Sequence, residues 1–176
     1  MVAIKPALKT AFGRDSWGFV LAVANIQTPV ITELNATAGF NLSCSLFGEQ
    51  EGVTGTTEKV TLPRLLCETT TYEVNGSTTF SMADLMVSFD PQAVTSADGK
   101  KAWTTLANNA SGFLWQRQGV DAQTDLATGQ FVNVYPVQLG TKIPGKTSTG
   151  ADGVYAFTQP ASITGLPAFN VAITAA

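Results

Sequence analysis

Short segments rich in apolar and β-branched residues recur along the chain, and clusters of Gly, Asp, Ser and Thr separate them. This pattern predicts strands joined by turns. Threonine occurs 24 times in the 176 residues, and with Val, Ile and Phe it favours the half-buried surface of a sheet. We expect strands over 28–35, 112–118, 130–140, 153–159 and 168–174. Strands of this length and spacing indicate a mainly β fold, either a β-sandwich or a small barrel.

A long β-hairpin is predicted around Asn75 and Gly76. A two-residue turn of type I′ needs positive φ at both positions, and an Asn-Gly pair tolerates this best. We therefore expect paired strands over 65–74 and 77–89. Both faces of this hairpin are largely polar near the turn, so it is suited to meet water on one face and a neighbouring subunit along its edges.

One flanking α-helix is predicted over 99–109. Ser96 and Asp98 offer side chains that can cap its N-terminus. Apolar residues follow them at helical spacing: Trp103, Leu106, Ala107 and Ala110. We expect this helix to cover one side of the sandwich.

Two segments fit no regular element, residues 1–27 and the Gly-rich residues 48–57. A small domain rarely keeps long segments without structure unless a partner orders them, so both are candidate assembly arms. We expect a single domain over 1–176, in which residues 1–27 are the arm and residues 28–176 form the core.

The composition indicates self-assembly. Hydrophobic residues make up 44% of the chain and charged residues only 13%, whereas a typical soluble protein carries about 25% charged residues. Much of the surface is therefore expected to be covered by other subunits. The 10 Lys and Arg against 13 Asp and Glu give a net charge of −3, which supplies no basic field to hold DNA.

An enzyme is not expected, because the chain has no histidine. This removes the commonest general base, the commonest metal ligand and every Ser-His or Cys-His nucleophile pair. Two cysteines, Cys44 and Cys67, are too few for a disulfide scaffold or a zinc site, and we expect them to be buried and reduced. We assign no catalytic residue, no cofactor and no metal.

Residues 140–147 (GTKIPGKT) match the phosphate-binding pattern G-x-x-x-x-G-K-T. That chemistry needs a helix directly after the Lys and Thr, because the phosphates bind at its N-terminus. The segment 148–153 (STGADG) that follows cannot open a stable helix. We therefore interpret the match as a coincidence in a chain rich in Gly and Thr.

Three carboxylates, Glu68, Glu73 and Asp84, lie on the predicted hairpin, where Glu73 and Asp84 share a face. They are interpreted first as solvated strand residues rather than as an acid–base pair. If the protein forms a channel, such groups would repel nucleic acid and keep it from adhering.

The large aromatic residues Trp17, Trp103 and Trp115 are expected to anchor the core or an interface. No basic groove accompanies them, so they do not indicate stacking on nucleic-acid bases. The longest apolar stretch, Phe19 to Ala24, is far shorter than the roughly 20 residues that a membrane span requires. With no apolar secretion signal near residue 1, we expect a soluble protein made inside the cell, without a membrane partner.

Several segments together resemble a major tail protein of a long-tailed bacteriophage: 29–36 (PVITELNA), 62–69 (LPRLLCET), 90–92 (DPQ), 131–140 (FVNVYPVQLG) and 155–173 (YAFTQPASITGLPAFNVAI). The resemblance spans most of the chain from about residue 28. It implies a subunit of a six-fold ring that stacks into the tail tube of the virion. Its partners would be further copies of itself, tail terminator and tail tip proteins, and the DNA and tape-measure protein that pass through the lumen without specific binding.

Within such a tube, residues 65–89 would contribute to the inner barrel, with Glu68, Glu73 and Asp84 as candidate lumen-facing charges. The candidate contacts between stacked rings are Trp17, Phe19, Phe47, Glu49 and Glu51. Two alternatives stay open: a tube protein of a contractile tail or secretion machine, and a structural or adhesive β-domain outside phages.

Overall fold

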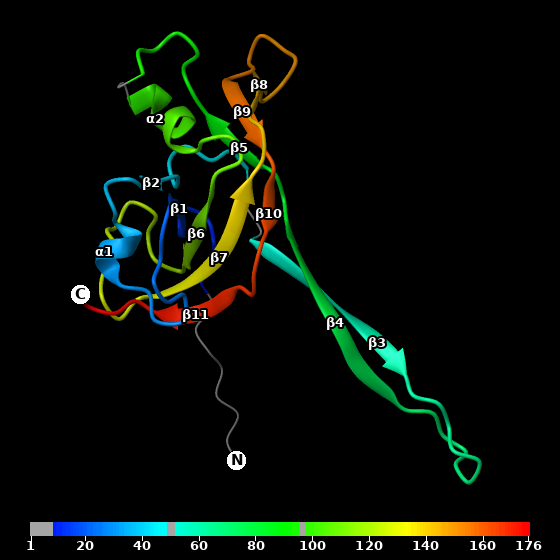
Figure 1. Ribbon diagram of the computed structural model, residues 1–176. Coiled ribbons are helices and arrows are strands. Elements are labelled where there is room, and N and C mark those ends of the chain that lie inside the picture. The colour runs from blue at the N-terminus through cyan, green and yellow to red at the C-terminus, as the bar shows by residue number, and fades with distance from the viewer. Residues whose placement is uncertain (1–8, 49–51, 96–97) are drawn as a thin grey trace.

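The computed structural model describes residues 9–48, 52–95 and 98–176 (Figure 1). The chain is mainly β, as predicted, with antiparallel sheets and two helices in the described residues. The elements in chain order are β1 Asp15–Val20, α1 Ile31–Leu34, β2 Phe40–Asn41, β3 Val53–Thr61, β4 Glu73–Met82, β5 Leu85–Ser88, α2 Asp98–Thr105, β6 Ser111–Gln118, β7 Phe131–Leu139, β8 Ile143–Lys146, β9 Tyr155–Gln159, β10 Ala161–Ile163 and β11 Ala168–Ala172.

The largest sheet is built around β6, which lies between β1 and β7. Strand β2 extends the sheet beyond β1, while β10 and β11 pair with the two halves of β7. Gly18 of β1 lies opposite Trp115 of β6, and a Cβ atom at Gly18 would come within 2.4 Å of the indole. Only glycine fits at this close approach, so β1 and the tryptophan fix each other's position.

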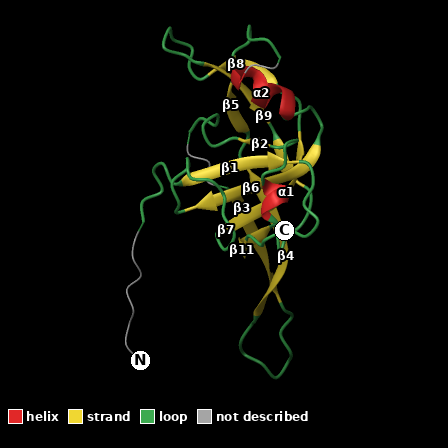
Figure 2. Ribbon diagram, turned by 90° about the vertical axis from the view of Figure 1, so that its left-hand side faces the viewer, coloured by secondary structure: helices red, strands yellow, loops and turns green. Residues whose placement is uncertain are grey.

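The large sheet is covered on both faces (Figure 2). On one face, Phe19 and Leu114 pack with Leu85 and Phe157 of the small sheet β5–β9–β8, and with α2. On the other face, a second cluster packs against α1 and the residue that follows β11, Ile173: Val20, Leu34, Trp115 and Val134 are among its other members. A sheet with two apolar faces accounts for the long buried runs in β1, β6 and β7.

Helix α2 confirms the predicted helix, although it ends at Thr105 rather than at residue 109. The Trp103 indole stacks on Phe89, with ring centroids 5.0 Å apart, and meets Phe157 edge-on at 5.2 Å. Trp17 and Trp115 are buried at 3% and 2% exposure, so all three tryptophans pack in or against the core. Strands β6, β7, β9 and β11 confirm the four predicted strands after residue 110.

The expected strand over 28–35 is wrong, because this segment forms the short helix α1. The Glu33 carboxylate accepts hydrogen bonds from the backbone N–H groups of Val30 at 3.2 Å and Ala24 at 3.1 Å. The first bond satisfies the N-cap donor of the helical turn, and the second ties the preceding loop to it; strand propensities do not register either interaction.

The prediction that residues 1–27 contain no regular element is also wrong. Strand β1 lies within this range and occupies the interior of the large sheet, between β2 and β6. Because β1 is buried on both faces, its residues show no apolar–polar alternation. A free arm could therefore comprise only the residues before Asp15.

The long hairpin exists, but its predicted turn and register are wrong. Its strands are β3 and β4, and residues 62–72 connect them, so the expected structureless segment 48–57 contributes the first half of β3. Asn75 and Gly76 lie inside β4, and neither has the positive φ that a type I′ turn needs. They lie where the register shifts between Thr57 and Lys59, so the local glycine marks a β-bulge rather than a turn.

Arg117 of β6 organises the loop between β6 and β7. Arg117 is buried at 1% exposure, and its guanidinium forms no salt bridge with a carboxylate of the described residues. It donates hydrogen bonds instead to five neutral oxygens: Asp121 O, Thr124 O, Asp125 O, Gln130 Oε1 and Ser16 Oγ. One side chain thereby satisfies several loop carbonyls that would otherwise be buried without partners.

Replacing this residue, Arg117→Lys, is expected to lower the free energy of unfolding by about 2–4 kcal/mol, because an ammonium cannot reach all five acceptors. Urea unfolding followed by tryptophan fluorescence measures the change. The control is Arg64→Lys at an exposed position, which should change stability by less than about 0.5 kcal/mol. Equal effects of the two substitutions would show that the buried guanidinium does not hold this loop.

Candidate functional site

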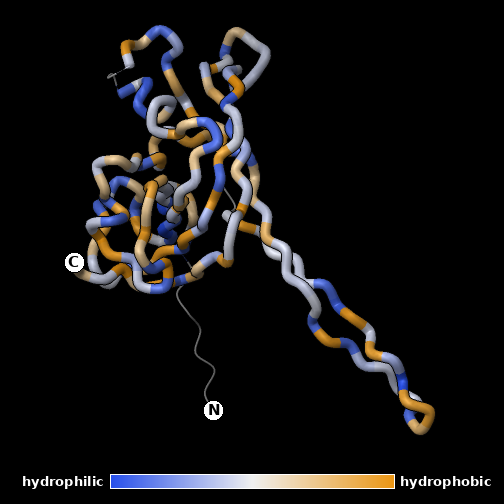
Figure 3. Tube along the Cα trace, in the orientation of Figure 1, coloured by the Kyte–Doolittle hydropathy of each residue, from blue (hydrophilic) through white to orange (hydrophobic). Residues whose placement is uncertain are grey.

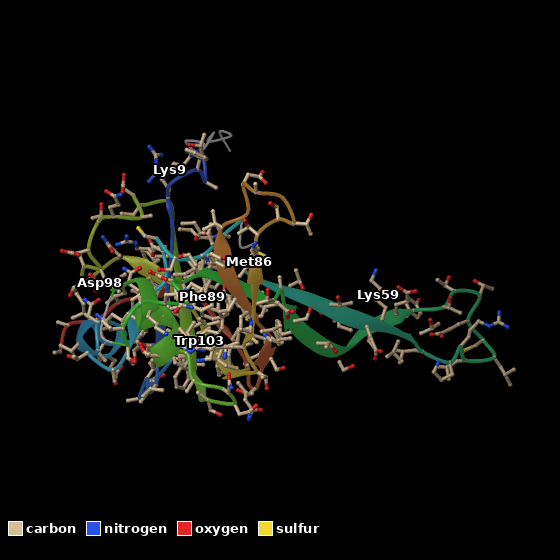
Figure 4. All side chains as sticks on the ribbon, turned by 90° about the horizontal axis from the view of Figure 1, so that it is seen from above. Lys9, Lys59, Met86, Phe89, Asp98 and Trp103 are labelled. Atoms are coloured by element: carbon tan, nitrogen blue, oxygen red, sulfur yellow. The ribbon has the colours of Figure 1, made fainter. Side chains whose placement is uncertain are left out.

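The β3–β4 hairpin projects from the body of the protein (Figure 1). Seen from above, Lys59 lies on the projecting ribbon, well separated from Phe89 and Trp103 in the body (Figure 4). The two strands pair with each other and, within the described residues, with no other strand. Nearly all of their side chains are exposed, so both faces and both edges of the ribbon are available to other molecules.

The face of the hairpin that carries Thr54 and Ser81 is lined by hydroxyl groups. Thr54 Oγ1 and Ser81 Oγ are 3.0 Å apart, and the Ser77 hydroxyl donates to Glu58 Oε2 at 3.0 Å. Side-chain pairs of this kind across two strands stabilise a ribbon without any apolar contact. This face therefore offers to its surroundings hydroxyl groups, the Glu58 carboxylate and, at its outer end, the exposed pair Val60 and Val74.

The opposite face is apolar at its root and polar further out. Val53 and Met82 pack against the main core, and the Phe80 ring lies 6.1 Å from Phe169 of β11. Beyond this root, the hydroxyls of Thr57 and Thr78 are 2.8 Å apart. The apolar root fixes the direction in which the outer part of the hairpin leaves the body.

A network of hydrogen bonds between polar side chains of the large sheet lies next to the hairpin root. The Tyr135 hydroxyl donates to Gln116 Oε1 at 2.7 Å, and Gln116 Nε2 donates to the Asp15 carboxylate at 3.1 Å. Gly52, which precedes β3, has a φ of +84°, and a Cβ atom there would lie 3.0 Å from Gln116 Oε1. Burial raises the pKa of Asp15, and it raises the pKa of Tyr135 to about 12.

The structure separates the three predicted lumen carboxylates. Glu68 lies in the connection 62–72, Glu73 begins β4, and Asp84 is exposed in the link from β4 to β5. Glu73 and Asp84 therefore lie at opposite ends of a ten-residue strand, roughly 30 Å apart. Glu73 is 3.9 Å from Lys59 Nζ, in an exposed pair that contributes little to stability.

Two of the predicted inter-ring contacts need correction. Trp17 and Phe19 are buried in the core at 3% and 0% exposure, so neither side chain projects from the surface toward another ring. Both residues belong to β1, whose burial the sequence did not reveal. Phe47 is half-buried, and its N–H donates to Met86 O. Glu49 and Glu51 lie outside the described residues.

An apolar tip at the end of the hairpin was missed by the sequence analysis. Leu62, Leu65 and Leu66, named here the leucine tip, lie in the connection between β3 and β4 and are exposed. Leu66 is fully exposed at 105%, and the end of the ribbon is correspondingly hydrophobic (Figure 3). The signal was present as the run LPRLL between two Thr-rich polar segments, but its last two residues, Leu65 and Leu66, were assigned to a strand over 65–74.

The expected burial of the cysteines is wrong, because Cys44 and Cys67 are both free and exposed. Cys67 directly follows Leu66 at the hairpin end, and Cys44 lies in the loop after β2. The sequence placed Cys67 within a strand over 65–74, whereas it lies in the connection 62–72 between β3 and β4.

Residues 140–147 form no phosphate loop. Ile143–Lys146 is strand β8, which pairs with β9, and the segment after it turns back into β9. Lys146 Nζ lies 5.3 Å from the centroid of the Tyr155 ring. Across the described residues, no group of His, Cys, Asp or Glu side chains could hold a metal ion. No helix among them has the length and hydrophobicity of a membrane span.

The buried phenol predicts a stability that depends on alkaline pH. The Tyr135 pKa is raised from 10.0 to about 12, so above pH 10 the unfolded chain loses this proton first and the free energy of unfolding falls. Tyr135→Phe should lower the free energy of unfolding by about 1 kcal/mol at pH 8, because the hydrogen bond to Gln116 is lost. Between pH 9 and 12 the wild type should lose up to about 2–3 kcal/mol relative to this variant. Urea titrations of both proteins at pH 8, 9 and 12 measure the free energy of unfolding. A difference between the two proteins that does not change with pH would contradict the prediction.

Comparisons with known proteins identify the family. No curated protein matches the chain. Among solved structures, the chain is similar to one chain of the cryo-EM structure of the anti-feeding prophage baseplate, 6-fold symmetrised, with a TM-score of 0.53 and 9% identity over 96% of this chain and 98% of that one. At this identity the similarity shows the fold alone. The family model described as phage tail tube protein matches residues 2–176. The chain therefore belongs to the phage tail tube protein family.

Proposed function

We propose that this phage tail structural protein forms a hexameric ring, and that stacked rings build the tube through which DNA passes into the host. The observation that carries the proposal is the β3–β4 hairpin, whose outer edges lack a strand partner in the described residues. A two-stranded ribbon alone in water is marginally stable. Pairing with the hairpins of neighbouring copies would satisfy these edges, and a closed ring would leave no edge free.

Six copies are proposed for two reasons. The family is that of tail tube proteins, and the solved chain with a similar fold comes from a structure that was symmetrised six-fold. The low share of charged residues, 13%, supports a subunit whose surface is largely covered by its neighbours. The match over residues 2–176 also supports one assembly unit that spans the chain.

The lumen is proposed to be lined by the polar hairpin surfaces. Hydroxyl groups and carboxylates provide no cation to hold a phosphate, so DNA is not retained during passage. The hydroxyl-lined face with Thr54, Ser77 and Ser81 fits this requirement. Glu68, Glu73 and Asp84 remain candidate lumen charges. By the strand register Glu73 lies on the opposite face, 3.9 Å from Lys59 Nζ, so a lumen lined by Glu73 would expose that face instead. The segment before β1 remains a candidate assembly arm.

The proposed partners follow from this position in the virion. The subunit contacts copies of itself, the tail terminator and the tail tip proteins, and the tape-measure protein and DNA pass through without specific binding. Assembly takes place in the host cytoplasm. Membership of a structural family implies a non-enzymatic role.

One alternative has an observation in its favour. The similar solved chain belongs to a baseplate, which favours a tube segment of a contractile tail or related machine. A sheath gene beside the gene for this protein would support the alternative, and its absence together with a tape-measure gene would support a long non-contractile tail. Membership of the tail tube family argues against an adhesive domain outside phages.

Cryo-electron microscopy of the purified full chain tests the proposal. The expected images are rings or tubes with six subunits around a central hole. A protein that stays monomeric at high concentration, even with tail initiator proteins present, would contradict it.

Charge reversal in the proposed lumen should retain DNA. The double variant Glu73→Lys and Asp84→Lys changes the formal charge of each subunit from −3 to +1. Tubes of this variant should bind DNA at low salt and release it as salt rises, because each added cation can neutralise a phosphate. Co-sedimentation of DNA with tubes measures the effect.

The matched control is Glu73→Gln with Asp84→Asn, which removes negative charge without adding cations and should bind DNA much more weakly. DNA binding by the lysine variant that equals that of wild-type tubes would show that these carboxylates do not face the lumen.

A further inference from the structure

We propose that the leucine tip of one copy docks into a pocket beside β1 of a second copy. This inference rests on the proposed function, because it requires an assembly of several copies. It adds the two surfaces that meet, one at the outer end of the hairpin and one near its root.

The tip is an apolar surface at the outer end of the ribbon. Leu65 and Leu66 are 63% and 105% exposed, so their side chains gain almost no packing within their own chain. Arg64 precedes them and is also exposed. An apolar group held away from the body on a polar ribbon is typical of an interaction site rather than of scattered surface hydrophobicity.

A pocket of about 540 Å³ lies beside β1. Phe12, Trp17, Leu46 and Gln118 line it together with Asp15. Phe12 is 93% exposed, which leaves an aromatic ring available to a ligand. The volume falls within the roughly 300–1,000 Å³ of pockets that bind small ligands, so two leucine side chains fit.

Charge complementarity favours the tip as the occupant of this pocket. Asp15 accepts hydrogen bonds from neutral donors, Trp17 Nε1 at 3.2 Å and Gln116 Nε2 at 3.1 Å. Within the described residues it forms no salt bridge. Arg64 beside the leucines would supply the cation that this half-buried carboxylate lacks.

The geometry requires that tip and pocket come from different copies. Gly48 lines the pocket and Gly52 packs over Gln116, so the pocket lies near the hairpin root. The tip lies beyond the nine residues of β3, roughly 30 Å from that root. The ribbon extends away from the body, so its own tip does not reach the pocket (Figure 1).

A contact between unlike surfaces of identical subunits repeats from copy to copy. Here a neighbour displaced by about one hairpin length would receive the tip, and its own tip would engage the next copy. Such a contact links successive rings rather than closing a single ring.

The two native cysteines provide the test, since Cys67 follows the tip residue Leu66 and Cys44 follows the pocket residue Ser43. Assembled full-length protein, mixed from isotopically labelled and unlabelled subunits, is treated with a short bismaleimide. Mass spectrometry of the digest should find a Cys44–Cys67 link that joins two different chains. The double variant Leu65→Ser and Leu66→Ser should weaken the contact by more than about tenfold per leucine, and the link should disappear.

The control is Leu166→Ser, which removes an exposed leucine outside the hairpin and should preserve the link. Electron microscopy of the same samples separates the two proposals. Single rings without stacks in the double-serine variant support docking. Wild-type tubes that give no link, a link within one chain, or normal stacking of the double-serine variant would overturn docking while the tube function stands. A wild-type protein that never forms rings would overturn both.

Discussion

The unpaired edges of the β3–β4 hairpin are the constraint on which the account of this protein depends. Backbone N–H and C=O groups along a strand edge need partners, and within the described residues neither strand has one beyond the other strand. The outer part of the hairpin projects away from its own domain (Figure 1), and its apolar residues Val60, Tyr72 and Val74 stay exposed. The backbone groups along these edges must form hydrogen bonds with water or with other subunits. Membership of the tail tube family favours other subunits.

The body of the protein fixes the direction in which this hairpin projects. Two apolar clusters on the faces of the large sheet make β6 and β7 rigid, and Arg117 closes the loop between them. The root then rests on Tyr135 and Phe169, through a hydrogen-bonded network on one side and ring packing on the other. A ribbon fixed at its root can present its edges in the same direction in every copy, which a symmetric assembly requires.

The sequence predicted what local patterns encode. The mainly β class, helix α2 and strands β6, β7, β9 and β11 follow from composition, caps and apolar spacing. Strand β1 was missed because a strand buried on both faces shows no alternation. Helix α1 was missed because the Glu33 carboxylate stabilises its start by accepting hydrogen bonds from Val30 N–H and from Ala24 N–H in the preceding loop.

The candidate site was predicted only in outline. A polar hairpin was expected, but Asn75-Gly76 was interpreted as a turn when tertiary pairing places it at a bulge in β4. That error displaced the strands, so Leu65, Leu66 and Cys67 were assigned to a strand over 65–74. Local turn chemistry cannot distinguish these cases, because glycine suits both: a type I′ turn uses its positive φ, whereas at Gly76 the missing Cβ leaves room for the Val60 side chain.

Hydrogen–deuterium exchange of the β3 and β4 amides tests the central claim most directly, because it reports on the hydrogen bonds of these strands in solution. The amides that point outward from the pair should exchange rapidly in dissociated subunits and become strongly protected in assembled tubes. Equal exchange of these amides in both states would contradict the account, since it would show that assembly leaves the edges of the hairpin unpaired.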